Sequence, residues 1–149
     1  MRKVFIMAVL FSLVIFSCKK SNTKQDEPKV EDLTYKKLTQ NKWQVVKAIS
    51  GNINVWTFPG LVESCLKDDY YRFKKDSVLT SFDYVNKCSG SPDSTNSTWY
   101  FINGNTKSLR GTFFNQTSDA TIIDLTDSTA QFRTLYNGSD VDIYFKKIN

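Results

Sequence analysis

Short runs of alternating apolar and polar residues recur about every ten positions from residue 42 to the C-terminus. Alternation with a period of two predicts strands with one buried face, because successive side chains of a strand point to opposite sides. Asn-Gly pairs at 103–104 and 137–138, which are favoured in two-residue hairpin turns, separate some of these runs. The predicted strands are residues 42–49, 69–74, 78–84, 97–102, 106–114, 120–126, 130–136 and 141–147.

Eight strands with mostly short connections predict an antiparallel meander that closes on itself, since closure removes the exposed sheet edges. The expected fold is therefore all-β, an eight-stranded up-and-down barrel, preceded by a short helix at residues 33–40 with Asp32 as its N-cap. Such a barrel either fills its interior or holds one small ligand. The alternation assigns these residues to the interior: Trp43, Val45, Tyr71, Phe73, Trp99, Phe101, Leu109, Phe113, Ile123, Leu125, Ala130, Phe132, Val141, Ile143 and Phe145.

The start of the chain has the pattern of an export signal. Arg2 precedes an almost entirely apolar run, residues 4–16. The run is shorter than the roughly 20 residues that span a bilayer and has the length of a signal-peptide hydrophobic region. Residues 15–18, Ile-Phe-Ser-Cys, resemble a bacterial lipobox. The resemblance implies a lipoprotein signal peptide at residues 1–17 and lipidation of Cys18; an incidental cysteine and an uncleaved anchor are the alternatives.

Residues 18–32 are predicted to be the lipidated cysteine and a flexible tether, because their mostly polar side chains cannot offset the entropy of ordering. Residues 33–149 are predicted to form the barrel domain. The expected location is the cell envelope, with the protein anchored in a membrane by its lipid. We expect the periplasmic face of the outer membrane, and the cell surface is the alternative.

Two segments resemble lipocalin-type barrels. Residues 38–43, Leu-Thr-Gln-Asn-Lys-Trp, are similar to the Leu-x-Gly-x-Trp opening of that family, in which the tryptophan, here Trp43, closes the barrel base. Residues 65–73 resemble the Cys-x-x-Asp-Asp-x-x-x-Phe signature of lipocalin-like lipoproteins from Gram-negative bacteria, in which a second cysteine follows a hairpin, as Cys88 does here. The resemblance implies architecture and location rather than an activity, since most members of the family have none assigned.

With Cys18 assigned to the lipid, Cys65 and Cys88 remain as a pair in an oxidising compartment, and we expect them to form a disulfide. Two free thiols or a metal pair are the alternatives. Asp68 and Asp69 are expected to be structural, capping the strand or pairing with a nearby base. Adjacent carboxylates at a strand start point to opposite faces, and no calcium-binding loop accompanies them.

The composition argues against most hydrolytic chemistry. The 149 residues include no histidine, which removes histidine general bases, Ser–His and Cys–His pairs and His-containing zinc sites. The 20 basic and 15 acidic residues are interspersed rather than gathered in a stripe, so we expect no nucleic-acid partner. We expect a protein that is not an enzyme and that has no cofactor and no metal.

Trp56, Phe58 and Leu61 lie in an unusually apolar connection between the first two predicted strands. In lipocalin-type barrels this connection covers the open mouth, so these residues are candidate ligand or partner contacts; a purely structural lid is the alternative. The expected function is binding of a small apolar or amphipathic ligand in the barrel mouth. The alternative is a filled barrel that acts as an interaction module, as an envelope complex subunit or an inhibitor.

Overall fold

Antiparallel strands make up most of residues 30–149, the part of the chain that the computed structural model describes. The predictions for residues 1–29, including the signal peptide, the lipidation of Cys18 and most of the tether, lie outside the described residues. In chain order the elements are α1 (Val30–Gln40), β1 (Lys42–Ser50), β2 (Ile53–Asn54), the 3-10 turn η1 (Ser64–Leu66), β3 (Tyr70–Phe73), β4 (Val78–Phe82), β5 (Ser94–Thr98), β6 (Tyr100–Ile102), β7 (Asn105–Phe113), β8 (Gln116–Leu125), β9 (Thr129–Tyr136) and β10 (Ser139–Ile148).

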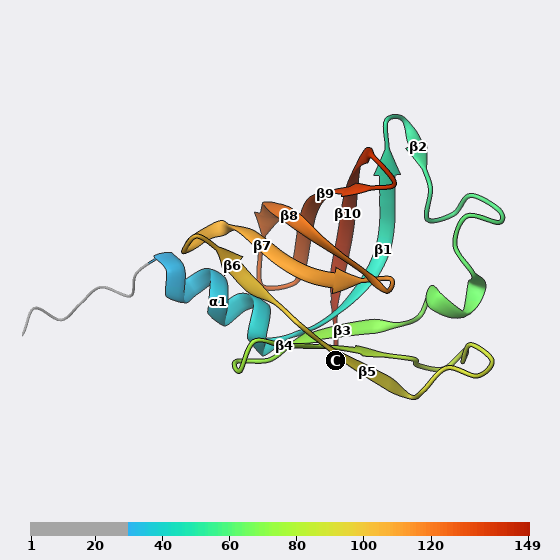
Figure 1. Cartoon of the computed structure of the whole chain (residues 1–149), viewed down its shortest axis with the longest axis horizontal. Helices are drawn as coiled ribbons and strands as arrows, with labels where there is room; N and C mark the ends of the chain where they lie inside the picture. The colour runs from blue at the N-terminus through green and yellow to red at the C-terminus, as the bar shows by residue number, and fades with distance from the viewer. Residues whose placement is uncertain (1–29) are drawn as a thin grey trace, which may run out of the picture.

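The strands form a nearly closed barrel in which they are ordered β5-β4-β3-β1-β10-β9-β8-β7-β6 (Figure 1). Only Trp99 separates β5 from β6; β5 pairs with β4 and β6 pairs with β7, so one interrupted strand joins both edges of the sheet. It corresponds to the predicted strand 97–102. The prediction of an all-β barrel with a short N-terminal helix is confirmed, whereas β2, which pairs with the end of β1, was not predicted.

The helix α1 covers one end of the barrel, where it contacts β3 and β7 (Figure 1). Leu38 is fully buried there, and its carbonyl oxygen accepts a hydrogen bond of 3.0 Å from Nε1 of Trp43. The ring of Tyr35 stacks on Trp99 with the ring centroids 5.6 Å apart. These contacts place Trp43 in the core directly beside the helix, at the end that α1 covers.

The helix begins at Val30, so the prediction that Asp32 is its N-cap is wrong, because this residue lies in the first turn. The proline at position 28 favours a helix start close behind it, which is consistent with a helix that begins at Val30 rather than after Asp32. Within residues 30–149, no helix has the length and apolar character that crossing a membrane requires.

Inward-facing side chains become smaller along the barrel with distance from α1. On β1 they change from Trp43 through Val45 to Ala48, and on β10 they change from Phe145 to Val141. Aromatic residues therefore fill the covered end, and the opposite end has room. The interior positions predicted by alternation are buried in most cases: Trp43, Val45, Tyr71, Phe73, Trp99, Leu109, Phe113, Ala130, Phe132, Val141, Ile143 and Phe145, with Phe101 and Leu125 partly buried against them.

Ile123 is the exception, because its side chain is 46% exposed. The pairing of β8 with β9 has a bulge between Ile122 and Asp124, which leaves Ile123 without a partner. A bulge inserts one residue and so changes which residues face inward. Ile122 packs against the core instead, and the prediction of Ile123 as an interior residue is wrong.

Both predicted Asn-Gly hairpin turns are confirmed. Asn103 and Gly104 have φ angles of 51° and 68°, and Asn137 and Gly138 have φ angles of 49° and 78°. Positive φ at both central positions matches the twist of the flanking strands and is the reason these residues are favoured there. The second turn joins β9 to β10 at the end of the barrel away from α1.

The bulge in β8 predicts unequal effects of truncation at two adjacent isoleucines. Ile122→Ala should lower the free energy of unfolding by about 1–3 kcal/mol, because it removes side-chain atoms packed on the core. Ile123→Ala should change it by less than about 0.5 kcal/mol, as expected for an exposed site. Urea denaturation of the two variants measures both values, and equal losses would contradict the bulge.

Candidate functional site

The end of the barrel opposite α1 holds a pocket of about 550 Å³. Buried side chains of β1 and β10 form its inner part together with Trp56, and its rim is formed by exposed residues of two loops. The apolar lining residues are Ala48, Val55, Trp56, Leu61, Val62, Leu66, Phe114, Val141 and Ile143. The polar lining residues are Ser50, Glu63, Tyr136, Asn137 and Ser139.

Residues 55–63, which follow β2 and which we call the lid segment, line the pocket at the barrel end away from α1 and lead to η1 (Figure 1). The N–H of Val55 donates to the carbonyl oxygen of Ala48 at 2.9 Å, and the N–H of Trp56 donates to Oδ1 of Asn54 at 3.2 Å. A turn with Gly60 at φ 79° reverses the chain near the tip of the segment. The first bond ties the start of the lid segment to β1, and the second ties it to the end of β2.

The three candidate contact residues of the lid segment have different surroundings. Trp56 is only 6% exposed and lines the pocket. Leu61 also lines the pocket, and its exposure of 59% places it at the rim. Phe58 is 49% exposed and is not among the lining residues. The structure therefore brings Trp56 and Leu61 together at the pocket and leaves Phe58 facing outward.

Phe114 is a pocket residue that sequence reasoning missed. It has a φ angle of 52° in the two-residue turn that joins β7 to β8, a conformation disfavoured for a bulky side chain. Its N–H donates to Oη of Tyr71 at 3.3 Å, and its ring centroid lies 5.5 Å from that of Trp56. The neighbouring Asn115, with φ 61°, was the available turn signal. Contacts with buried aromatic rings therefore hold Phe114 beside the pocket.

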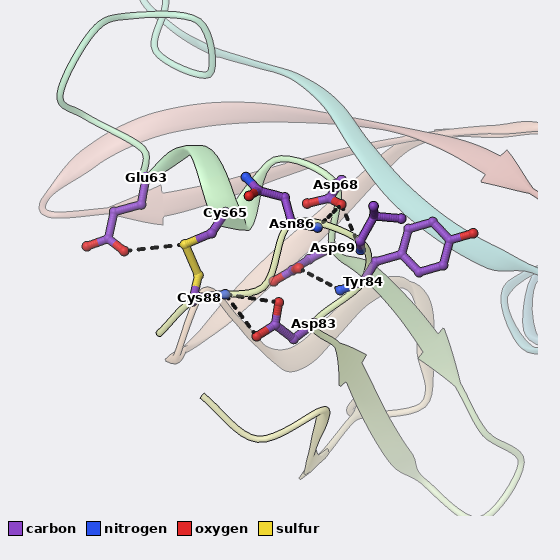
Figure 2. Close-up of a disulfide and its surroundings, with 9 residues drawn as sticks. Glu63, Cys65, Asp68, Asp69, Asp83, Tyr84, Asn86 and Cys88 are labelled. Carbon is purple, nitrogen blue, oxygen red and sulfur yellow. Dashed lines mark hydrogen bonds between the residues drawn. A yellow bond between two sulfur atoms is a disulfide. The ribbon is translucent and has the colours of Figure 1, made fainter. Parts of the chain in front are cut away.

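The predicted disulfide between Cys65 and Cys88 is confirmed, with the Cα atoms 5.1 Å apart (Figure 2). It links η1, directly after the lid segment, to the loop that follows β4. Glu63 lies close to both sulfur atoms, and the three residues have the proximity of a metal site. Because both sulfur atoms are already bonded to each other, neither is a thiolate that could bind a metal in this state.

Three aspartates hold the loop that carries Cys88 (Figure 2). Oδ2 of Asp68 accepts hydrogen bonds from the N–H groups of Val85 and Asn86, at 2.9 and 2.8 Å. Asp83 accepts from the N–H of Cys88 at 3.1 Å, and Asp69 accepts from the N–H of Tyr84 at 3.4 Å. Asp68 and Asp69 are therefore structural, as expected. Their partners are backbone groups, and no ion pair of residues 30–149 joins them to Lys67 or Arg72.

Partial burial raises the pKa of Asp69 to about 6, and the hydrogen bond from Tyr84 opposes this only in part. The nearby carboxylates of Asp83 and Asp68 raise it further. Burial likewise raises the pKa of the Tyr71 hydroxyl well above its usual range. Tyr71 is therefore held as a neutral phenol beside Phe114.

No family model matches this chain, and no curated protein matches it significantly. The chemistry of the site therefore has to be inferred from the pocket itself. An apolar interior with a polar rim can bury the apolar body of a small molecule and hydrogen-bond its polar end.

Loss of the disulfide should destabilise the fold. Replacing Cys65 and Cys88 by alanine opens a loop with a sequence separation of 23. The free energy of unfolding should fall by about 3 kcal/mol in the chain-entropy model. Denaturant titration under oxidising conditions measures the difference. An unchanged midpoint would show that the hydrogen bonds of the aspartates are sufficient to hold the loop.

Asp69→Asn should stabilise the protein at neutral pH. The folded-state pKa of about 6 lies above the unfolded value, so the contribution of the protonated carboxyl to stability is lost as pH rises from about 4 to about 6. The variant has no carboxyl to ionise and should therefore lack this loss. Its free energy of unfolding at pH 7 should exceed that of the wild type by about 1 kcal/mol, after allowance for solvent screening.

Unfolding titrations at pH 4 and pH 7 provide the measurement, with Asp76→Asn in the exposed turn after β3 as the matched control. The control should follow the wild type at both pH values. A constant difference between Asp69→Asn and the wild type at the two pH values would contradict the assignment.

Proposed function

We propose that this chain is a lipid-anchored, lipocalin-like envelope protein that binds a small apolar or amphipathic molecule in the barrel mouth, beneath the lid segment. The observation that carries the proposal is the pocket of about 550 Å³ at the barrel end away from α1. Its volume lies within the range of about 300–1,000 Å³ that is usual for small-molecule sites.

The distribution of side-chain size supports ligand binding over a filled barrel. The covered end is packed with rings such as Phe73, Phe132 and Phe145. The ring centroids of Phe73 and Phe132 lie 6.3 Å apart, and those of Phe132 and Phe145 lie 5.0 Å apart. At the other end, Ala48 and Val141 occupy the inward positions of β1 and β10. Burial of apolar ligand surface there would contribute about 25 cal/mol for each Å² removed from water.

The envelope location rests on the lipobox-like residues that end at Cys18, and the Cys65–Cys88 disulfide is consistent with it. Disulfides persist in oxidising compartments such as the bacterial periplasm and are rare in the cytosol. Intact-mass analysis of the protein from envelope fractions, with Cys18→Ala as the comparison, tests the lipid anchor directly.

A non-enzymatic interaction module is a second candidate. It is supported by exposed apolar side chains on two loops that the disulfide joins: Phe58 and Leu61 in the lid segment, and Val85, which is 76% exposed, in the loop after β4. Exposed apolar side chains can contribute to a contact surface for another envelope protein. Crosslinking in the native envelope tests this candidate, and recovery of the monomer alone would count against it.

Native mass spectrometry of the full chain, produced in an exporting host and extracted in a detergent of known mass, tests the ligand proposal, because mass added by detergent can then be told apart from that of a ligand. We expect reproducible extra mass that denaturation releases as one class of small molecule. The protein without extra mass, even after incubation with amphiphiles of graded chain length, would contradict it.

Filling the pocket should abolish binding without loss of the fold. Ala48→Phe places a ring in the space beside Trp56 and Val141, so the extra mass should disappear while the circular dichroism spectrum stays unchanged. Val46→Phe on the same strand is the matched control, because Val46 is exposed at a bulge outside the pocket. Equal retention of ligand by both variants would place the binding site elsewhere.

A further inference from the structure

The charge of the pocket is set by a single lining residue. Of the residues that line it, only Glu63 has a charged side chain; no lysine or arginine is among them. The other polar members of the rim, such as Ser139 and Asn137, are neutral and can donate or accept hydrogen bonds. A ligand in the pocket therefore meets one carboxylate and no compensating positive group.

The carboxylate of Glu63 is not neutralised by the protein. None of the ion pairs among residues 30–149 includes Glu63, and its side chain does not cap η1, which it directly precedes. Its Oε2 lies 3.7 Å from Sγ of Cys65, but this sulfur is in a disulfide and has no proton to donate. Figure 2 shows Glu63 on the far side of the disulfide from Asp68, Asp69 and Asp83.

The rim also contains an aromatic face. Tyr136, near the end of β9, lines the pocket and is exposed over nearly half of its surface. Aromatic faces attract ammonium groups through the ring quadrupole, and carboxylates attract them by charge. A polar rim with Glu63 and Tyr136 above an apolar interior has the chemistry of a site for an amine that carries an apolar chain.

We propose that the pocket selects cationic amphiphiles, primary or quaternary amines with an apolar chain, over anionic amphiphiles of the same length. This inference rests on the proposed function, that the pocket binds an amphipathic molecule, and adds the charge of its polar group. An anion such as a fatty acid would place its carboxylate beside that of Glu63, and like charges at short range repel.

The preference has to come from the local carboxylate, because the chain as a whole carries a net charge of +5. The field of distant charges is screened beyond about 8 Å at physiological ionic strength, whereas a group in direct contact is screened less. Removal of the Glu63 charge should therefore remove the preference, and removal of another acidic group near the pocket should not.

Calorimetric titration of the full chain in lipid nanodiscs, with empty nanodiscs as the blank, tests the inference. The probes are octylammonium, octanol and octanoate, which share one apolar chain and differ in charge. Octylammonium should bind about tenfold more tightly than octanoate, since a partly exposed charge contributes a modest gain for the cation and a similar loss for the anion. Octanol should lie between them.

Glu63→Gln should bring the three affinities together, and Glu63→Lys should reverse their order. Asp140→Asn is the matched control: this exposed residue lies at the start of β10, outside the lining set, and its loss should leave the preference intact. Circular dichroism verifies that each variant is folded. Because Glu63→Gln and Glu63→Lys each test the role of the charge, the test stays valid if one of them fails to fold.

The two hypotheses fail in different ways. Binding of octanol, together with octanoate affinity equal to or above that of octylammonium, would overturn the charge selection and leave the pocket function in place. Absence of binding for all three probes would overturn the proposed function and the inference with it. A preference for octylammonium that persists in Glu63→Gln would also overturn the inference, because the selecting group would then be another residue.

Discussion

The pairing of β1 with β10 is the constraint on which the rest of the structure depends. It joins the first and last strands of the barrel, from Lys42 opposite Ile148 to Ser50 opposite Val141. The entropic cost of closing so long a loop grows only with the logarithm of its length. The pairing also leaves neither β1 nor β10 as an exposed edge of the sheet. The same pairing aligns the end of β1, which leads into the lid segment, with the start of β10. The lid segment and the β9–β10 hairpin thereby come to enclose one space, although they are far apart in the sequence.

Most of the fold could be predicted because its signals are local: the alternation along each strand, the Asn-Gly turns and the pair of cysteines in the predicted barrel domain. The predictions fail at residues whose position is set by contacts between segments that are distant in the sequence. Ile123 lies at a bulge that exists only in the pairing of β8 with β9. Phe114 adopts positive φ because Tyr71 and Trp56 hold its backbone and ring, and these contacts come from distant strands and the lid segment. Of the candidate site, the lid segment was identified from its apolar residues, whereas Glu63 was not associated with a pocket.

The pocket is a consequence of inward side chains that become smaller toward the barrel mouth. Rings packed against Trp43 and beneath α1 fix the diameter at the covered end, and the sheet cannot contract at the other end without breaking strand pairs. Small residues at Ala48 and Val141 therefore leave space rather than drawing the walls together. A protein that needed only a stable barrel would gain burial by enlarging these residues, since filled interiors are favoured by both apolar burial and dispersion. The small residues at the mouth are thus the strongest structural argument for a bound molecule.

The loop that follows β4 is held by a cluster of aspartates whose mutual repulsion is unfavourable. Asp68, Asp69 and Asp83 lie near one another although like charges repel, and Asp69 is held in surroundings that raise its pKa. In return, their oxygen atoms accept hydrogen bonds from N–H groups that have no strand partner, and the loop carries Cys88 to Cys65. The disulfide in turn fixes η1 and positions Glu63 at the rim of the pocket. The aspartate cluster beside the ends of β3 and β4 is thus connected, through the loop and the disulfide, to the carboxylate at the pocket. The electrostatics of the pocket therefore depend on the order of a loop outside it.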